Sequence, residues 1–192
     1  MGSLSTNASL FSRALVLDGA GSPTTITVLS TEALDVTYQI NVYPDLTDHA
    51  GSMTLSGTTY TTNVRASNVN SISSWSFVSG GSSGDVGGVN SVSAYSTQTL
   101  GATTATPAGT VYSSSASNIY LSYTNGNYYR DTQINFGLTD LNAAGGIGSV
   151  VIQCGSSAGA MGKFQVSFTP VIPKDATHVM TWYIRHSWAR GP

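Results

Sequence analysis

The three histidines of the chain, His49, His178 and His186, are the residues that most often mark a metal or proton-transfer site. None of them stands in a two-histidine metal motif such as H-E-x-x-H. His178 and His186 lie on one face of a strand-like segment, roughly 26 Å apart at about 3.3 Å per residue, which is too far to share one ion. We therefore expect histidines at the surface or at strand ends, and no metal site.

The loop sequence "PDLTDH" holds a second set of reactive groups, because Asp45 and Asp48 precede His49. Two carboxylates on one loop suit a two-carboxylate glycosidase or a calcium ion. Aspartates that follow a proline more often accept hydrogen bonds from the backbone of a turn. The turn role is our expectation, and a hydrolase that uses Asp45, Asp48 and His49 is kept as an alternative.

The glycine-rich stretch "GGSSGDVGG" is not followed by a lysine-bearing helix, so it does not predict a phosphate-binding loop. Serines are abundant, and a catalytic triad can be assembled from distant strands, so sequence spacing alone does not exclude one. No constellation of residues favours catalysis. We expect a protein that is not an enzyme, without catalytic residues and without a cofactor.

Six of the ten tyrosines fall between residues 95 and 129, in a stretch with little charge. Amphipathic rings on an uncharged surface can stack on sugars or anchor a partner protein. The candidates for such contacts are Tyr95, Tyr112, Tyr120 and Tyr129. Tyr123 and Tyr128 flank Asn125-Gly126, a strong hairpin signal, and are expected to pair across the two strands.

The C-terminal stretch "HVMTWYIRHSWAR" concentrates aromatic and basic residues in a chain that has few of either. Its alternation places Met180, Trp182 and Ile184 on one side of a strand, opposite Val179, Thr181, Tyr183 and Arg185. Large aromatic side chains bury a great deal of area, so packing or docking is a better explanation than catalysis. The residues expected to pack or dock are Trp182, Arg185, Trp188 and Arg190.

Composition narrows the function further. Charged residues make up 8% of the chain and its net charge is −2, compared with about 25% charged residues in ordinary soluble proteins. Such a chain does not neutralise a row of phosphates, which argues against nucleic-acid binding. The lone Cys154 lies in "SVVIQC" and is expected to be a small apolar filler. We expect no signal peptide and no membrane insertion.

Alternating apolar and polar residues predict a series of short strands and turns. Among them are a strand over 36–42 and a strand in which Ile134, Phe136 and Leu138 share one face. We predict an all-β fold, an antiparallel β-sandwich of jelly-roll or immunoglobulin-like type. Residues 1–23 are predicted to form an extended N-terminal arm, and residues 24–192 a single domain. Pro170 and Pro173 are expected to flank a corner between two strands, with Lys174 and Asp175 at its solvated tip.

Residues 79–110 are rich in Gly, Ser and Thr and carry one charge, Asp85, and one proline, Pro107. A disordered linker usually carries more of both. This segment is therefore predicted to be a long ordered loop or an excursion that packs on a neighbouring subunit.

The stretch "YRDTQINFGLTDLNAAGGIGSVVIQ" followed by "GKFQVSFTPVIPKDATHVMTWYIRHSWAR" resembles the C-terminal strands of tailed-bacteriophage virion proteins. The shared pattern is a segment F-x-P-x-I-P-K that leads to a last strand ending in S-W-x-R. The stretch "DVTYQINVYPDLTDHAGSMTLSGTTYTTNVRASNVN" is similar to β-rich phage tail and fibre modules. The resemblance covers about half of the chain, and no functional residues carry over with it.

The resemblance implies a non-enzymatic virion protein that is made in the bacterial cytoplasm and placed on the particle surface. A tail or neck component, such as a fibre or adaptor, and a capsid decoration protein are both open. Its partners would be other virion proteins and further copies of itself, with a trimer favoured. The alternative is a carbohydrate- or receptor-binding module for host attachment, with the tyrosines as its sugar platform.

Overall fold

The computed structural model describes residues 16–31, 33–35, 43–71, 74–75, 88–112, 117–121, 128–156 and 159–189. The chain divides into two units, Met1–Ile40 and Asn41–Pro192. In the described part of the first unit the backbone forms one isolated bridge, between Leu17 and Pro23. The stretch 24–30, "TTITVLS", has a strand-like sequence but forms no strand in the structure. The predicted strand over 36–42 lies outside the described residues.

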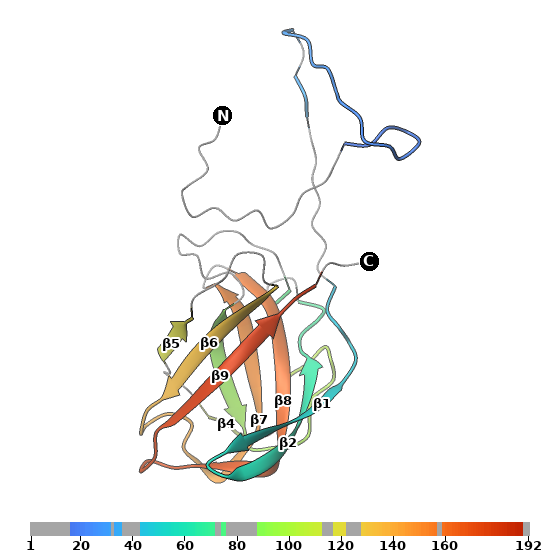
Figure 1. The fold of residues 1–192 in the computed structure, drawn as a ribbon. Helices are drawn as coiled ribbons and strands as arrows, with labels where there is room; N and C mark the ends of the chain where they lie inside the picture. The colour runs from blue at the N-terminus through green and yellow to red at the C-terminus, as the bar shows by residue number, and fades with distance from the viewer. Residues whose placement is uncertain are drawn as a thin grey trace. The chain divides into compact units, whose positions relative to one another are not determined.

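The second unit is built from antiparallel strands in two sheets (Figure 1). The strands are β1 His49–Leu55, β2 Thr58–Ala66, β3 Val89–Tyr95, β4 Val111–Tyr112, β5 Ser117–Tyr120, β6 Tyr129–Phe136, β7 Ala143–Ser156, β8 Gly159–Lys174 and β9 Met180–Ser187. The larger sheet has the order β1-β2-β8-β7-β3-β4, and the smaller has the order β5-β6-β9. No helix occurs among the described residues, so the prediction of an all-β fold with antiparallel sheets is confirmed.

The two sheets enclose a shared apolar core. Ile134 and Phe136 of β6 are 0% and 1% exposed, and Trp182 of β9 is 7% exposed. The Trp182 ring lies 5.0 Å from that of Phe136 and 5.9 Å from that of Phe168 on β8, centroid to centroid. The Phe168 contact joins the sheets across the core. The predicted alternation along β6 and β9 is therefore confirmed at Ile134, Phe136, Met180 and Trp182.

The described part of segment 79–110, residues 88–110, is not a loop throughout, in contrast to the prediction. Residues 89–95 form β3, which lies between β7 and β4 in the larger sheet. Val89 and Ala94 are completely buried. β3 has the sequence "VNSVSAY", and its small serine and alanine side chains fit between closely packed neighbouring strands. The absence of charged residues from this strand therefore reflects burial rather than flexibility.

The structure also differs from the predicted corner between two strands at Pro170 and Pro173. Pro170 and Pro173 lie inside β8, where the β7–β8 register shifts between Ile147 and Ser149. The chain turns only after Lys174. Lys174 is 4% exposed, and its ammonium donates to Asn142 Oδ1 (3.0 Å) and to the Asp175 carbonyl (2.8 Å). Lys174 therefore ties two turns together instead of facing solvent.

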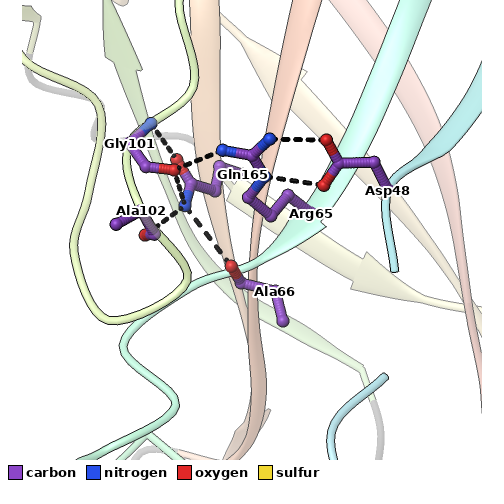
Figure 2. A network of polar contacts seen from close by, with 6 residues as sticks. All are labelled: Asp48, Arg65, Ala66, Gly101, Ala102 and Gln165. Carbon is purple, nitrogen blue, oxygen red and sulfur yellow. Dashed lines mark hydrogen bonds and ion pairs between the residues drawn. The ribbon is translucent and has the colours of Figure 1, made fainter. Parts of the chain in front are cut away.

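The connection between β3 and β4, residues 96–110, lies against the larger sheet on the face opposite the core (Figure 2). Gln165 of β8 is 0% exposed and anchors this loop. Its Oε1 accepts from Gly101 N at 2.7 Å, and its Nε2 lies 3.0–3.3 Å from the carbonyls of Ala66, Gly101, Ala102 and Ala105. One amide thus satisfies several backbone groups of the loop at once.

Arg65 of β2 holds the same loop from the side (Figure 2). Its Nη1 donates to the Gly101 carbonyl at 2.9 Å, and its Nε and Nη2 donate to the Asp48 carboxylate. The hydrogen bonds from Arg65 lower the pKa of Asp48, and Asp48 raises that of Arg65. Close backbone contact continues at Gly148, where an added Cβ would lie 2.5 Å from the Thr97 carbonyl. The loop therefore covers part of this outer face with the chain's own residues.

Candidate interaction surface

On the outer face of the smaller sheet, the described side chains are exposed on β9 and partly buried on β6, whereas part of the larger sheet is covered by the loop. Alternate residues of β6 and β9 point outward there, opposite the buried Ile134 and Trp182. The paired register brings together Tyr129 with Ser187, Asp131 with Arg185, Gln133 with Tyr183, and Asn135 with Thr181. This set of residues is called the β6–β9 face below.

An ion pair with an aromatic neighbour occupies one end of the β6–β9 face. Arg185 Nε donates to Asp131 Oδ1 at 2.8 Å, and Arg185 Nη2 donates to Asp131 Oδ2 at 2.9 Å. The guanidinium carbon lies 3.9 Å from the centroid of the Tyr129 ring. The bidentate hydrogen bonds from Arg185 lower the pKa of Asp131, and the same bonds raise the pKa of Arg185. Arg185 is thereby held in one position while its side chain stays 58% exposed.

The other end of the β6–β9 face carries hydrogen-bonded polar side chains next to exposed Tyr183 and Val179. Asn135 Oδ1 accepts from Gln133 Nε2 at 3.0 Å and from Thr181 Oγ1 at 3.1 Å. Tyr183 and the adjoining Val179 are each 71% exposed. A face that combines an exposed tyrosine with a pre-positioned arginine has the composition of a protein interface rather than that of a catalytic cleft.

The Asp131–Arg185 pair is expected to make stability depend on acid pH. The folded-state pKa of Asp131 lies below its unfolded value of about 3.9. The pair therefore stabilises the fold above pH of about 4, and this contribution is lost as pH falls through the folded-state pKa. Asp131→Asn should lower the urea midpoint slightly at pH 7 and not at all in strong acid, because exposed pairs contribute little.

Unfolding curves of the Asp131→Asn variant at a series of pH values test this expectation, with Asp35→Asn in the other unit as control. A deficit that is constant or that grows toward acid pH would contradict the assigned role of the pair.

The four C-terminal residues expected to pack or dock take different positions. Trp182 is a core residue. Trp188 is partly buried, with its ring centroid 5.7 Å from that of His186. Arg185 is exposed on the β6–β9 face. Arg190 lies outside the described residues.

The four candidate tyrosines do not share one surface. Tyr95 in β3 is 8% exposed and is not part of the core cluster, whereas the partly buried Tyr112 in β4 packs against that cluster. Tyr129 lies beneath Arg185 on the smaller sheet. Tyr120 pairs with Thr132, and its side chain is outside the described part. The Asn125-Gly126 turn is also outside it, although β5 and β6 pair antiparallel as that turn predicts.

The histidines and loop carboxylates have local partners. Asp45 accepts from Thr47 N at 2.9 Å and contacts His49 Nε2 at 2.9 Å, so its predicted turn role is confirmed. Asp48 instead pairs with Arg65. Asp175 contacts His178 Nδ1 at 2.8 Å, and this hydrogen bond is the main cause of a strongly lowered pKa at Asp175. No group of three metal-ligating side chains lies together among the described residues.

His186 lies at the end of β9, as expected for a strand-end histidine, but it is buried rather than at the surface. It is 9% exposed, and its ring centroid lies 5.5 Å from that of Phe164. The imidazole follows the inward parity of β9, which places a flat ring among aromatic neighbours.

Two stretches match the letters of the G-x-S-x-G nucleophile motif, at residues 80–84 and 155–159. Ser82 and Ser157 lie outside the described residues. The second stretch joins β7 to β8, with Ser156 paired to Gly159, whereas the motif requires a turn from a strand into a helix. Cys154 is 1% exposed, as expected for an apolar filler, and burial raises the pKa of its thiol to about 12.

Sequence reasoning missed the most important polar residues. Gln165 and Arg65 stand in ordinary strand patterns, and their loop partners lie 64 and 36 residues away. Tyr183 was placed on the solvent side of its strand but not singled out. The sequence could have singled out Tyr183, since a large aromatic residue on the polar side of a strand is unusual.

Comparisons with protein-family models, with curated proteins and with solved structures find no match for this chain. In the described part of the chain, no helix is long and apolar enough to cross a membrane.

Proposed function

We propose that the protein is a non-enzymatic structural component on the surface of a tailed-bacteriophage particle, which docks through the β6–β9 face. The observation that carries the proposal is the combination of exposed Tyr183 with the immobilised Arg185 on one open sheet face. The low charge of the chain and the resemblance of its C-terminal strands to virion proteins support it as well.

Docking costs less free energy when the side chains of the interface are already ordered. Ordering a flexible arginine at an interface costs about 0.5–1.5 kcal/mol of side-chain entropy. Arg185 is already ordered by Asp131 and Tyr129, so little of this cost is left for a partner to overcome. Tyrosine adds a rigid contact area with a polar tip. An exposed sheet face of this kind suits a protein partner better than a small-molecule substrate.

The proposed partners are other virion proteins, in the tail or neck or on the capsid, together with further copies of this chain in a trimer. We further propose that the sandwich is of jelly-roll or immunoglobulin-like type. Its support is that β2 and β8 are neighbours although they lie far apart in the sequence, as in Greek-key connections.

Gold-labelled antibody against the protein, applied to purified particles and viewed by electron microscopy, tests the proposed location. Label over the head is expected for a decoration protein, and label at the tail or neck for a fibre or adaptor. Absence of label from particles that have also been opened by mild denaturation would overturn a virion role.

Tyr183→Ala is expected to reduce incorporation into particles by about 30-fold, the effect of losing a contact of about 2 kcal/mol. Its melting temperature should stay unchanged, because the side chain is 71% exposed in the single chain. Leu138→Ala, at an exposed turn position off the β6–β9 face, is the matched control and should incorporate normally. Equal incorporation of both variants, measured by quantitative blotting of purified particles, would refute docking through this face.

A further inference from the structure

A cavity of about 610 Å³ lies at one end of the two sheets, between the start of β7 and the end of β8. β7 bulges there, because its register on β8 shifts between Ala143 and Ile147, and residues 144–146 have no partner in that register. Bulges are over-represented next to functional sites. The bulge lines the cavity together with apolar side chains such as Val171 and Ala176. No residue of the β6–β9 face lines it, so the cavity is separate from that face.

Lys174 is the one basic residue among the described residues that line this cavity. Its side chain follows the inward parity of Ile172, and it is only 4% exposed. An ammonium has three N–H donors, and two of them reach Asn142 Oδ1 and the Asp175 carbonyl, which are both neutral oxygens. Lys174, Asn142 and Asp175 all line the cavity, so the ammonium lies at its wall. The third N–H has no acceptor in the described part of the chain.

The buried charge of Lys174 also lacks a direct counter-charge, since it forms no ion pair with any described carboxylate. Lysine is rarely buried without such a partner, because an unpaired charge is costly to remove from water. Asp175 lines the same cavity, but its Oδ1 accepts from Thr177 N at 2.8 Å and contacts His178 Nδ1 at 2.8 Å. The Asp175 side chain is 63% exposed, so water screens its charge. An anion that enters the cavity therefore supplies the missing counter-charge.

We propose that this cavity binds the carboxylate of a glutamate or aspartate side chain from a partner protein. The carboxylate accepts the third N–H of Lys174 in a charge-assisted hydrogen bond, which is stronger than one between neutral groups. The apolar walls then contact the methylene groups of the acidic residue. The bulge leaves room for it, because a Cβ added at Gly145 meets no atom within 4 Å.

The size of the cavity favours an acidic residue of a polypeptide over a free small anion. Its volume of about 610 Å³ lies within the range of about 300–1,000 Å³ that is typical of binding pockets. It therefore accommodates a side chain with part of its backbone, whereas a lone carboxylate leaves most of the apolar wall uncovered. This inference goes beyond the proposed function, since it uses the end of the sheets and does not depend on a particle.

Titration of the isotope-labelled full chain with blocked peptides, followed by NMR, tests the site. The first probe is the tripeptide glycine-glutamate-glycine with both ends blocked, and the second is the same peptide with glutamine in the centre. We expect the glutamate peptide to shift the amide signals of Ala144 and Gly145 and to bind at least about tenfold more tightly than the glutamine peptide. Equal affinities, or no shift with either peptide at about 10 mM, would overturn the proposal.

Sodium acetate is the probe for a free carboxylate. We expect it to bind at least about tenfold more weakly than the glutamate peptide, because it contacts the ammonium but little of the apolar wall. Acetate that binds as tightly as the peptide would assign the cavity to small free carboxylates and overturn its assignment to the side chain of a partner.

Lys174→Met should weaken binding of the glutamate peptide at least about tenfold, because it removes the ammonium and keeps an unbranched side chain. Lys163→Met, which removes the other lysine of the chain from the same strand, is the matched control and should bind as the wild type does. Normal binding by a folded Lys174→Met variant would refute the role of the ammonium. If that variant does not fold, the comparison of the two peptides on the wild-type chain still decides. Tyr183→Ala should leave peptide binding unchanged, so this site and docking through the β6–β9 face can fail separately.

Discussion

Trp182→Ala is expected to destabilise the folded protein by about 3–5 kcal/mol and to sharply reduce its soluble yield. The Trp182 side chain is 7% exposed and packs between Phe136 of its own sheet and Phe168 of the other. Truncation removes an aromatic contact between the two sheets and leaves a cavity that neighbouring β-strands cannot close. Chemical unfolding monitored by fluorescence of the remaining tryptophans measures the loss.

Trp182→Phe is the matched control for this prediction. The indole Nε1 of Trp182 is buried without a hydrogen-bond partner among the described residues, so phenylalanine gives up no hydrogen bond and leaves a smaller cavity. We expect it to retain most of the stability. An alanine variant with wild-type stability would mean that Trp182 does not belong to the core.

Gln165→Leu is the second large effect that the structure predicts. Leucine keeps the volume of the side chain but leaves Gly101 N without its acceptor. It also removes the Gln165 donor from the Gly101 and Ala102 carbonyls, which still accept from Arg65 Nη1 and Ala105 N. A buried polar group without a partner costs about 1–3 kcal/mol, and we expect a loss in this range from the Gly101 amide. Hydrogen exchange should show the Gly101 amide losing its protection while amides in β6 and β9 keep theirs.

Gln98→Ala provides the comparison for Gln165→Leu. Gln98 is exposed and donates to the Phe168 carbonyl at 2.6 Å at the margin of the same loop. Water can replace that hydrogen bond at an exposed position, so its loss should cost clearly less than that of Gln165. If the two variants were equally destabilised, Gln165 would not be the anchor of the loop.

Together these predictions separate the residues that stabilise the fold from the exposed residues that are proposed to contact a partner. The core aromatics join the two sheets, and Gln165 with Arg65 fixes the 96–110 loop over the larger sheet. The β9 residues of the β6–β9 face contribute little to the stability of the single chain, because Thr181, Tyr183, Arg185 and Ser187 are exposed. Variants at Tyr183 can therefore report on assembly without the confounding effect of unfolding.

The sequence by itself determined the fold class and the inward faces of several strands. Alternation is a local property with a period of two residues, and it placed Ile134, Phe136, Met180 and Trp182 correctly. The same rule put Tyr183 and Arg185 on the solvent side of β9. The alternation along the chain was enough to predict an all-β protein.

Only the tertiary structure decided which segments far apart in the sequence meet. The sequence did not predict β3, which lies in a Gly/Ser/Thr-rich stretch. Its burial results from its neighbours β7 and β4 and not from its own composition. Lys174, His186 and Gln165 read as ordinary polar residues, and each is buried because a remote turn, aromatic ring or loop supplies its partner. Such pairings depend on strand order, and strand order leaves no periodic signal in the sequence.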